Sequence, residues 1–266
     1  MFFFYITLFT LIDIINFPFD RGANIKGSSK AFDNIKFKLT NLNIDNIYNI
    51  KSDKNHLRIV MGDAFMQHQN ILGSKKLPLL IGGDHTCAIS SIYSSNNYCI
   101  LNGKRLGILW FDAHADFNTM ETSLTGNLHG TPVAVLCGHT LSILNFGFNL
   151  SPNQFAYYGI RDIDGLEFIR FTDYNMNILD NENMLIEWCK NFDYIHLSFD
   201  MDCIDSSEMK CVNTPVTNGP KLNEIIRMLK VVKSSNKLMS MDLVEYNPEL
   251  GDNSSIVINI LETVLV

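Results

Sequence analysis

Short apolar runs recur along the chain, and several of them end in acidic residues or a histidine. A mostly apolar run of about four to eight residues is typical of a strand that is buried on both faces of a parallel sheet. The carboxyl ends of parallel strands lie at one edge of an open α/β sheet, which is the edge that carries binding and catalytic sites. Residues 77–81 precede Asp84 and His85, 106–111 precede Asp112, His114 and Asp116, 194–199 precede Asp200 and Asp202, and 237–244 precede Glu245.

Segments with helical periodicity alternate with these runs. Further strands are predicted at 8–17 and 155–160, and residues 40–54, which are rich in Asn and Asp, are expected to form an exposed connection. The alternation predicts a single α/β domain over residues 1–266, because no internal repeat, low-complexity tract or linker divides the chain. Helices are predicted at 29–39, 55–72, 183–191 and 221–233, and others begin at about Thr86, Thr131 and Ser255.

The first 17 residues are apolar and aromatic, so a signal peptide or a membrane span has to be considered. The segment lacks a positively charged start and a cleavage site of small residues, and Asp13 and Asn16 interrupt it. We therefore expect the first buried strand in this region. Secretion stays open as the alternative.

Composition narrows the class of protein. Of the 266 residues, 46% are hydrophobic and 18% are charged, which is typical of a globular chain. The formal net charge is −7 and no basic cluster is present, which argues against nucleic acid or an anionic membrane as a partner. The six cysteines form no CxxC pair and are expected to be reduced thiols of a cytoplasmic protein. Cys203 follows Asp202, but in extended backbone its thiol would point away from that carboxylate.

The segment Asp112-Ala113-His114-Ala115-Asp116 is the centre of the candidate chemistry. If the preceding strand geometry continues, the side chains of Asp112, His114 and Asp116 point to the same side, whereas a helix would turn His114 away. Two like charges about 4 Å apart cost about 4 kcal/mol at an effective dielectric constant near 20. A bound metal cation would offset this repulsion, so the segment predicts a metal site.

The motifs together resemble the signatures of the ureohydrolase family, which includes arginases, agmatinases and formiminoglutamases. They appear in the family's order: Gly82 to His85, Asp112 to Asp116, Ser198 to Asp202, and Glu245 to Pro248. The loop Pro18 to Gly22 looks like the family's amino-terminal element, and the segment 118–133 looks like the arginases in particular. This resemblance implies a three-layer α/β/α fold with a mainly parallel central sheet, as in arginase.

The resemblance also implies a binuclear site that holds two Mn²⁺ ions. Four carboxylates would balance the charge of two dications, and oxygen-rich sets with histidine suit a manganese-like ion, although iron, cobalt and nickel stay open. One ion would be held by His85, Asp112, Asp116 and Asp200, and the other by Asp112, His114, Asp200 and Asp202.

Catalytic roles follow from the same resemblance. A hydroxide bridging the two metals would attack the guanidinium carbon, and Asp116 would accept a hydrogen bond from it. His129 would shuttle a proton to the leaving amine, and Glu245 would pair with the guanidinium group. Thr214 looks like the family threonine that supports this glutamate and histidine.

Residues matching Asn118 and Thr125 meet the α-carboxylate of the substrate in arginases, and the residue matching Asp164 meets the α-amino group, with Glu167 assisting. A site built for a carboxylate should reject agmatine, because its polar groups would be left unpaired. The resemblance therefore implies hydrolysis of L-arginine to L-ornithine and urea, by a homo-oligomer that is a trimer or hexamer. The alternatives are an agmatinase or another guanidino-acid hydrolase, and a non-catalytic metal-binding relative.

The sequence departs from the family pattern after Asp202. The family loop is rich in Pro and Gly, whereas residues 203–213 contain neither, and Asn213 stands where glycine is usual. Single buried acids or histidines more often cap helices or satisfy core hydrogen bonds, and Arg161 could simply pair with Asp162 and Asp164. Thr122 is expected to be a solvated loop residue, and His56, His68, His139 and His196 match no motif.

Overall fold

The computed structural model describes residues 11–52, 56–139, 144 and 146–266. Within these ranges, eight strands form one sheet in the order β2-β1-β3-β8-β7-β4-β5-β6, and every adjacent pair is parallel. The strands are β1 (Ile12–Phe17), β2 (Ile44–Asn49), β3 (Leu77–Gly82), β4 (Leu106–Phe111), β5 (Phe155–Tyr158), β6 (Asn177–Ile178), β7 (Tyr194–Asp200) and β8 (Leu238–Val244).

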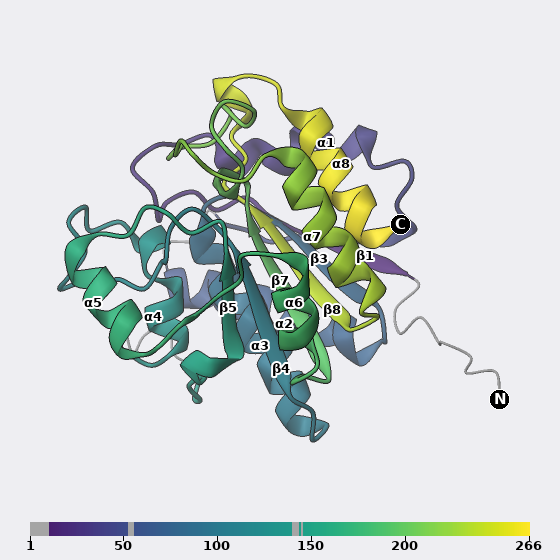
Figure 1. Ribbon diagram of the computed structural model, residues 1–266. Coiled ribbons are helices and arrows are strands. Elements are labelled where there is room, and N and C mark those ends of the chain that lie inside the picture. The colour runs from purple at the N-terminus through teal and green to yellow at the C-terminus, as the bar shows by residue number, and fades with distance from the viewer. Residues whose placement is uncertain (1–10, 53–55, 140–143, 145) are drawn as a thin grey trace.

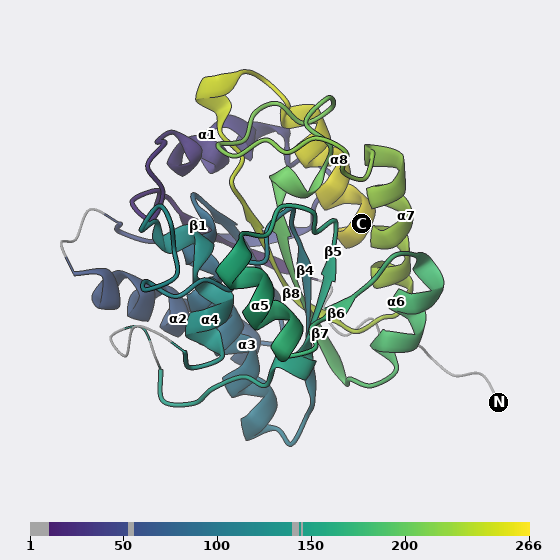
Figure 2. The ribbon, with the colours of Figure 1, turned by 60° about the vertical axis from the view of Figure 1, so that its left-hand side comes forward.

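Helices cover both faces of the sheet, and Figure 2 shows the sheet between the two helical layers. The predicted three-layer α/β/α fold is thus confirmed, and the sheet is wholly parallel among its named strands. One face carries α1 (Ala31–Ile35), α6 (Glu182–Cys189), α7 (Leu222–Ser234) and α8 (Ser254–Leu265), and the other carries α2 (Leu57–Gly73), α3 (Ala88–Leu101), α4 (Pro132–Leu136) and α5 (Gly165–Asp173).

The central strands are mostly apolar because successive side chains enter different cores, although β7 carries His196 and Ser198 and β8 carries Ser240 and Asp242. In β4, Leu109 and Phe111 pack into the core under α6, α7 and α8, whereas Leu106, Ile108 and Trp110 pack into the core under α2 and α3. Alternation of this kind follows from the period of two in a strand. It explains why β4, which is covered on both faces, shows no polar positions in its sequence.

The strand order brings the four predicted motif strands together. β3, β8, β7 and β4 are consecutive neighbours in the middle of the sheet (Figure 1), although β8 comes last in the chain. Because all four run in the same direction, their carboxyl ends lie side by side at one edge. The acids and histidines that follow them therefore start from adjacent positions.

Several predicted elements differ from the structure. Residues 44–49 form the edge strand β2 instead of an exposed connection. The backbone and polar side chains of β2 pair with β1, because Asp13 accepts from the backbone N–H of Asn46 and Asn16 donates to Asn49. The first strand begins at Ile12, and residues 8–10 of the predicted strand lie outside the described ranges. The predicted helix at 29–39 divides into a 3-10 helix Ser28–Lys30, then α1, then a 3-10 helix Lys36–Lys38, and the helix expected after 86 is longer than predicted.

Besides β2, the helix α5 and the short strand β6 were not predicted. α2, α6 and α7 begin and end within about two residues of the predicted positions, and α4 and α8, for which only a start was predicted, begin within one residue of it. Asn55, at the predicted start of α2, lies outside the described residues. All six cysteines are unpaired and buried. Among the described residues, no helix is both long and apolar enough to cross a bilayer.

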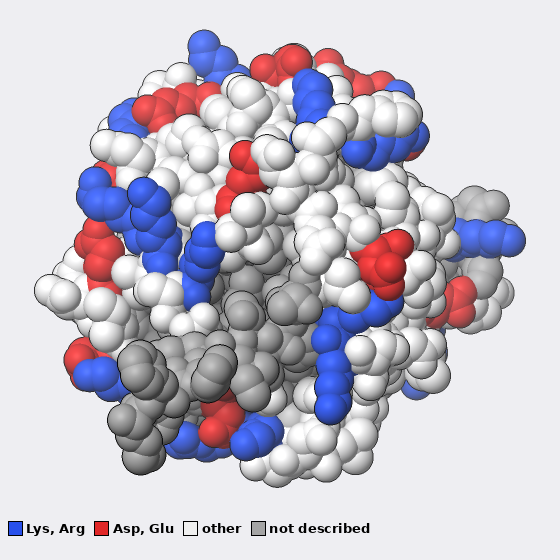
Figure 3. Space-filling model, turned by 90° about the vertical axis from the view of Figure 1, so that its right-hand side faces the viewer, with Lys and Arg blue, Asp and Glu red and all other residues white. Residues whose placement is uncertain are grey.

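The surface shows no dominant charge on the face drawn in Figure 3, where basic and acidic side chains are interspersed.

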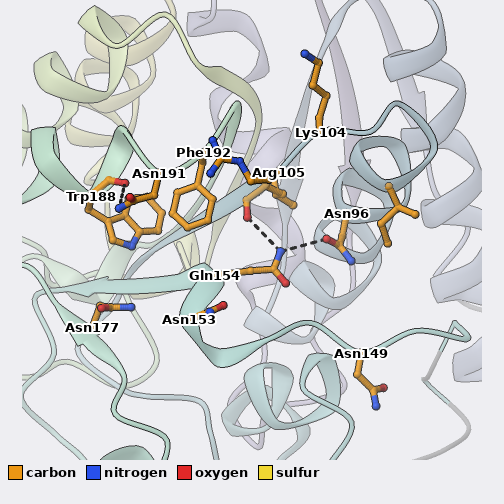
Figure 4. Close-up of a pocket in the computed structure, with 12 residues that line it drawn as sticks. Asn96, Lys104, Arg105, Asn149, Asn153, Gln154, Asn177, Trp188, Asn191 and Phe192 are labelled. Carbon is orange, nitrogen blue, oxygen red and sulfur yellow. Dashed lines mark hydrogen bonds between the residues drawn. The ribbon is translucent and has the colours of Figure 1, made fainter.

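A cavity of about 620 Å³ lies at the end of the sheet where β4 begins, and Figure 4 shows the amide side chains around it. Gln154 lies across it and donates to the Leu106 carbonyl and to Asn96. The described residues that line this cavity include no carboxylate and no histidine, so it does not carry the predicted chemistry.

Candidate metal centre and active site

Three buried carboxylates that follow or end the central strands surround the Nδ1 atom of His85, which is buried as well. This nitrogen lies 3.0 Å from Asp112 Oδ2, 3.1 Å from Asp200 Oδ2 and 3.2 Å from Asp116 Oδ2. His85 follows β3, Asp112 and Asp116 follow β4, and Asp200 ends β7. All four residues are at most 6% exposed. The side chains predicted for the first metal ion therefore converge on one point.

A second group of side chains lies next to the first. His114 Nδ1 is 3.1 Å from Asp202 Oδ2 and 3.4 Å from Asp112 Oδ1. Ligand atoms of His85, Asp112 and Asp200, and separately those of Asp112, His114 and Asp202, all lie within 4.8 Å of one another. Asp112 belongs to both groups, as a carboxylate that bridges two ions would. Asp200, predicted to bridge as well, is found only in the first group.

Local backbone geometry explains why the residues after β4 share a direction. The N–H of Asp112 donates to the Tyr158 carbonyl, and His114 forms an isolated parallel bridge with Asp162, so strand-like pairing continues beyond β4. Asp116 then has a φ of 49°, in the left-handed region that side chains with a β-carbon rarely adopt. Backbone strain of this kind is typical of functional sites.

Neighbouring groups fix the orientation of the first histidine. His85 Nε2 lies 2.9 Å from Ser198 Oγ, and its ring stacks on Trp110 with centroids 4.2 Å apart. A proton on Nε2 that is donated to Ser198 leaves the lone pair of Nδ1 directed at the carboxylates, which is the tautomer a metal ligand needs. The indole N–H of Trp110 also donates to Asp112 Oδ2 at 2.9 Å.

The chemical environment of these groups fits divalent cations. His85 Nδ1 is buried without a hydrogen bond of acceptable geometry, although three carboxylate oxygens surround it. Burial raises the pKa of Asp200, and the carboxylates of Asp202 and Asp112 raise it further, so this arrangement is unfavourable when no cation is shared. An imidazole nitrogen among carboxylate oxygens is a donor set suited to manganese or a similar first-row ion.

His129 and Glu245 form a pair beside the carboxylates. His129 Nδ1 lies 2.9 Å from Glu245 Oε1, which also accepts a hydrogen bond from the backbone N–H of His85 at 3.0 Å. Burial lowers the pKa of His129, but the hydrogen bond and charge of Glu245, together with the charges of Asp116 and Asp84, outweigh burial and raise it to about 9. Glu245 is buried and has a φ of 63°, so its carboxylate is held on a strained segment.

A cavity of about 240 Å³ opens beside these groups. Although it is smaller than the cavity at the other end of the sheet, it is the one that carries ionisable groups. Glu245 does not line it but lies in contact with His129, which does. The lining includes His114, Asp116, Asn118, Thr125, His129, Asp164, Glu167, Asp200, Asp202 and Thr214, which are all sequence-predicted site residues.

The residues predicted to bind the amino-acid end of a substrate contact one another. Asn118 Nδ2 donates to Asp164 Oδ2 at 2.9 Å, and Asn118 Oδ1 accepts from the Thr122 hydroxyl at 2.9 Å. Thr122 was expected to be solvated, so its role in orienting Asn118 was missed. Glu167 accepts from the backbone N–H of Phe117 at 2.7 Å, and burial raises its pKa to about 8.

Two residues of the loop after Asp202 make contacts that differ from the prediction. Thr214 was expected to support Glu245 and His129, but its hydroxyl donates to Asp202 Oδ2 at 2.9 Å. The side chain that reaches Glu245 is that of Asn213, whose Nδ2 lies 3.3 Å from Glu245 Oε2. The only sequence signal for this contact was the departure from glycine at position 213.

Arg161 holds the same loop in place. Its guanidinium group donates to backbone carbonyls rather than pairing with Asp162 and Asp164 as the sequence suggested. The acceptors are the carbonyl oxygens of Gly159, Asp202, Cys203, Ile204, Val216 and Thr217, at 2.6 to 3.5 Å. The thiol of Cys203 donates to the Tyr158 carbonyl at 3.2 Å, so it points away from the candidate ligands as expected.

The fold and the site together define a parallel α/β/α protein with a candidate binuclear metal centre at the carboxyl edge of its sheet. The chain belongs to the Arginase family, whose sequence pattern matches residues 12–265. The sequence-based recognition of the ureohydrolases is therefore confirmed.

Similar proteins include arginases from several organisms. The chain is 34% identical to the arginase of Plasmodium falciparum over 253 residues, which are 86% of this chain and 58% of that protein. It is 32% identical to Staphylococcus aureus arginase over 68% of this chain and 64% of that protein, and 27% identical to Bacillus subtilis arginase over 90% and 91%. The chain thus spans less than two thirds of the first two relatives.

Solved structures agree with the family assignment. The Entamoeba histolytica arginase in complex with L-ornithine superposes with a TM-score of 0.90 at 26% identity and covers 96% of this chain and 98% of that one. Bacillus subtilis arginase gives a TM-score of 0.88 at 25% identity with the same coverage. A putative agmatinase from Clostridium difficile shares the fold at a TM-score of 0.77 and 19% identity.

Proposed function

We propose that this chain is a metal-dependent hydrolase that cleaves the guanidinium group of L-arginine to give L-ornithine and urea. The observation that carries the proposal is the convergence of two overlapping groups of metal-ligand candidates beside a polar cavity. Membership of the Arginase family and similarity to arginases over most of the chain support the same activity.

The proposed cofactor is two Mn²⁺ ions per chain. The buried, unpartnered Nδ1 of His85 and the surrounding carboxylates support this choice. When bound, the ions would supply Lewis-acid activation of a water molecule at neutral pH. The proposed ligands are His85, Asp112, Asp116 and Asp200 for one ion, and Asp112, His114, Asp200 and Asp202 for the other.

Side chains of this protein would orient the attack and move the proton. Asp116 accepts a hydrogen bond from the attacking water. Glu245 pairs with the guanidinium group and holds His129 through Nδ1, which leaves Nε2 of that ring for the leaving nitrogen. A pKa of about 9 keeps His129 protonated near neutral pH, so it can donate a proton to the ornithine amine as the carbon–nitrogen bond breaks.

The amino-acid end of arginine would bind at the cavity wall. Asn118 and Thr125 are proposed to meet the α-carboxylate, and Asp164 and Glu167 the α-amino group. Their polar atoms would stay partly unpaired with agmatine, which lacks the carboxylate, and this favours arginine as substrate. Thr214 contributes to substrate binding indirectly in this proposal, because it holds Asp202.

The test is elemental analysis combined with assays of urea release after manganese loading. We expect two manganese ions per chain and urea from L-arginine, with little from agmatine. Faster release from agmatine or another guanidine would replace the proposed substrate. Stoichiometric metal without urea from any guanidine would favour a non-catalytic relative.

We further propose a cytoplasmic homo-oligomer, either a trimer or a hexamer. Six unpaired, buried cysteines support a reducing compartment. Light scattering on the manganese-loaded protein would measure the mass of the assembly, and a monomer would contradict the proposal.

A further inference from the structure

The carboxylate of Glu245 is held by three donors. Its Oε1 accepts from the backbone N–H of His85 and from Nδ1 of His129, whereas Oε2 accepts from Nδ2 of Asn213 at 3.3 Å. Glu245 and Asn213 are 1% and 7% exposed, so water does not readily replace a lost donor. Asn213 is therefore the only side chain among the described residues that donates to this second oxygen.

Backbone pairing brings Asn213 to this position. Val212 and Tyr246 form an isolated antiparallel bridge, and the N–H of Asn247 donates to the Cys211 carbonyl at 2.8 Å. In an antiparallel bridge, the residue after Val212 lies opposite the residue before Tyr246. Asn213 and Glu245 are thus set face to face by the backbone before their side chains interact.

The amide of Asn213 is itself fixed by other partners. Its Nδ2 also donates to the Ile25 carbonyl at 3.2 Å, and its Oδ1 accepts from Asn247 Nδ2 at 2.7 Å. Asn247 is fully buried and donates to the Lys26 carbonyl at 3.0 Å. The amide cannot rotate without breaking these contacts, so its donor is directed at Glu245 in advance.

The next residue serves a different part of the site. Thr214 donates to Asp202 Oδ2, on the side of the candidate metal ligands. Two consecutive residues therefore hold two separate carboxylates, one proposed to pair with the guanidinium group and the other with a metal ion. This separation offers a matched comparison within one loop.

We propose that Asn213 is a positioning residue that fixes Glu245 for the guanidinium end of the substrate. A glycine at position 213 would have no side chain to donate this hydrogen bond. The inference rests on the function proposed above. Asn213 does not touch the substrate, and its effect is confined to ligands that carry a guanidinium group. The amino-acid end is bound elsewhere, by Asn118 and Asp164.

The experiment compares Asn213→Ala and Asn213→Asp with the wild type, all loaded with manganese. Asn213→Asp keeps the size and the acceptor oxygen but places a carboxylate against Glu245. The measurements are kcat and KM for L-arginine, the inhibition constant of L-ornithine, which lacks the guanidinium group, and the bound manganese. Thr214→Val, with Thr214→Ser as its conservative rescue, provides the comparison within the loop.

We expect kcat/KM for arginine to fall about tenfold in Asn213→Ala, as for loss of a hydrogen bond to a charged group, and further in Asn213→Asp. The inhibition constant of L-ornithine should stay within about twofold of the wild-type value, because ornithine has no guanidinium group to pair with Glu245. The manganese content should be unchanged, because Glu245 is not among the proposed metal ligands. Thr214→Val should instead weaken manganese binding about tenfold, and Thr214→Ser should restore it.

Equal losses in arginine and ornithine binding, or loss of manganese in the Asn213 variants, would show a merely structural role and overturn the inference. Unchanged kinetics in both Asn213 variants would overturn it as well. In each of these cases the wild type still releases urea from arginine, so the proposed function stands. Wild-type protein that releases no urea would overturn the proposed function and this inference together.

Discussion

At the scale of single residues, each ionisable group at the site is tuned by neighbours within a few ångströms. His129 has its pKa raised by the contact with Glu245 against the effect of burial, while Glu167 has its pKa raised by burial and by the carboxylates of Asp116 and Asp164. Both shifts favour the protonated form, so His129 is positively charged near neutral pH, whereas Glu167 is neutral until a cation beside it offsets its burial. These properties suit proton donation by His129 and pairing of Glu167 with an ammonium group.

Replacing His129 with Ala is expected to lower kcat by about a hundredfold or more, the usual contribution of general acid–base catalysis. Manganese content should remain near normal, because His129 belongs to neither group of ligand candidates. Urea assays and elemental analysis on the same sample measure both quantities. His139→Ala is the matched control, since that ring packs on Tyr174 and does not line the cavity. Metal loss in His129→Ala would count against its role in proton transfer.

Glu167 should make the stability of the metal-free protein depend on pH. Its pKa is about 8 in the fold against 4.5 in the unfolded chain, so the fold binds the proton more tightly and loses stability as the pH rises between these values. Glu167→Gln keeps an oxygen to accept from Phe117 and removes the titration. We expect the Tm of the variant to fall less than that of the wild type between pH 5 and pH 8. Parallel curves from calorimetry would contradict this assignment.

At the scale of elements, the sequence was most informative where both faces of a strand are buried. β3, β4 and β7 were predicted from mostly apolar runs, because such runs have few other stable arrangements. β2 was missed because an edge strand contacts only one neighbour and can be polar, as its pairing with Asp13 and Asn16 of β1 shows. The start of α5 had a signal that was overlooked, an N-cap Asp164 followed three residues later by Glu167.

Arg161 holds the loop between β7 and α7 through its backbone carbonyls. Arg161→Met is expected to destabilise the protein by about 2 kcal/mol or more, because several partly buried backbone carbonyls would lose a charged donor. Since Asp202 lies in this loop, manganese affinity should fall as well. Denaturant unfolding of the metal-free protein and metal titration measure the two effects. Arg105→Met is the control, as that side chain is 68% exposed and pairs with Asp193 at 3.5 Å. Equal stability in both variants would show that Arg161 does not organise the loop.

At the scale of the whole molecule, the position of the site could be predicted but its internal contacts could not. Acids at the ends of four parallel strands must meet at one edge, so His85, Asp112 and Asp200 were brought together by topology alone. The contacts of Thr214 and Asn213 depend on a bridge between segments that are about 34 residues apart, and this bridge involves only Val212 and Tyr246. A single backbone pairing of that kind leaves no periodic pattern in the sequence. The contact with Glu245 was therefore assigned to Thr214, whereas Asn213 makes it and Thr214 contacts Asp202.

The arrangement also implies that the molecule gives up stability to hold its metal ions. Burial and the carboxylates of Asp202 and Asp112 raise the folded-state pKa of Asp200, so ionising this group costs stability as the pH rises above its unfolded value of 3.8. Asp200→Asn keeps the oxygen that accepts from the N–H of Asp202 and removes the charge.

We therefore expect metal-free Asp200→Asn protein to have a higher Tm at pH 8 than the metal-free wild type. The order should reverse when manganese is added, because an ion that binds only the folded state stabilises it by RT ln(1 + [L]/Kd), and the variant binds that ion poorly. Calorimetry with chelator and then with excess manganese tests both halves. A metal-free variant less stable than the wild type would mean that Asp200 contributes favourable contacts to the empty fold. A variant that gains as much stability from manganese as the wild type would remove Asp200 from the ligand set.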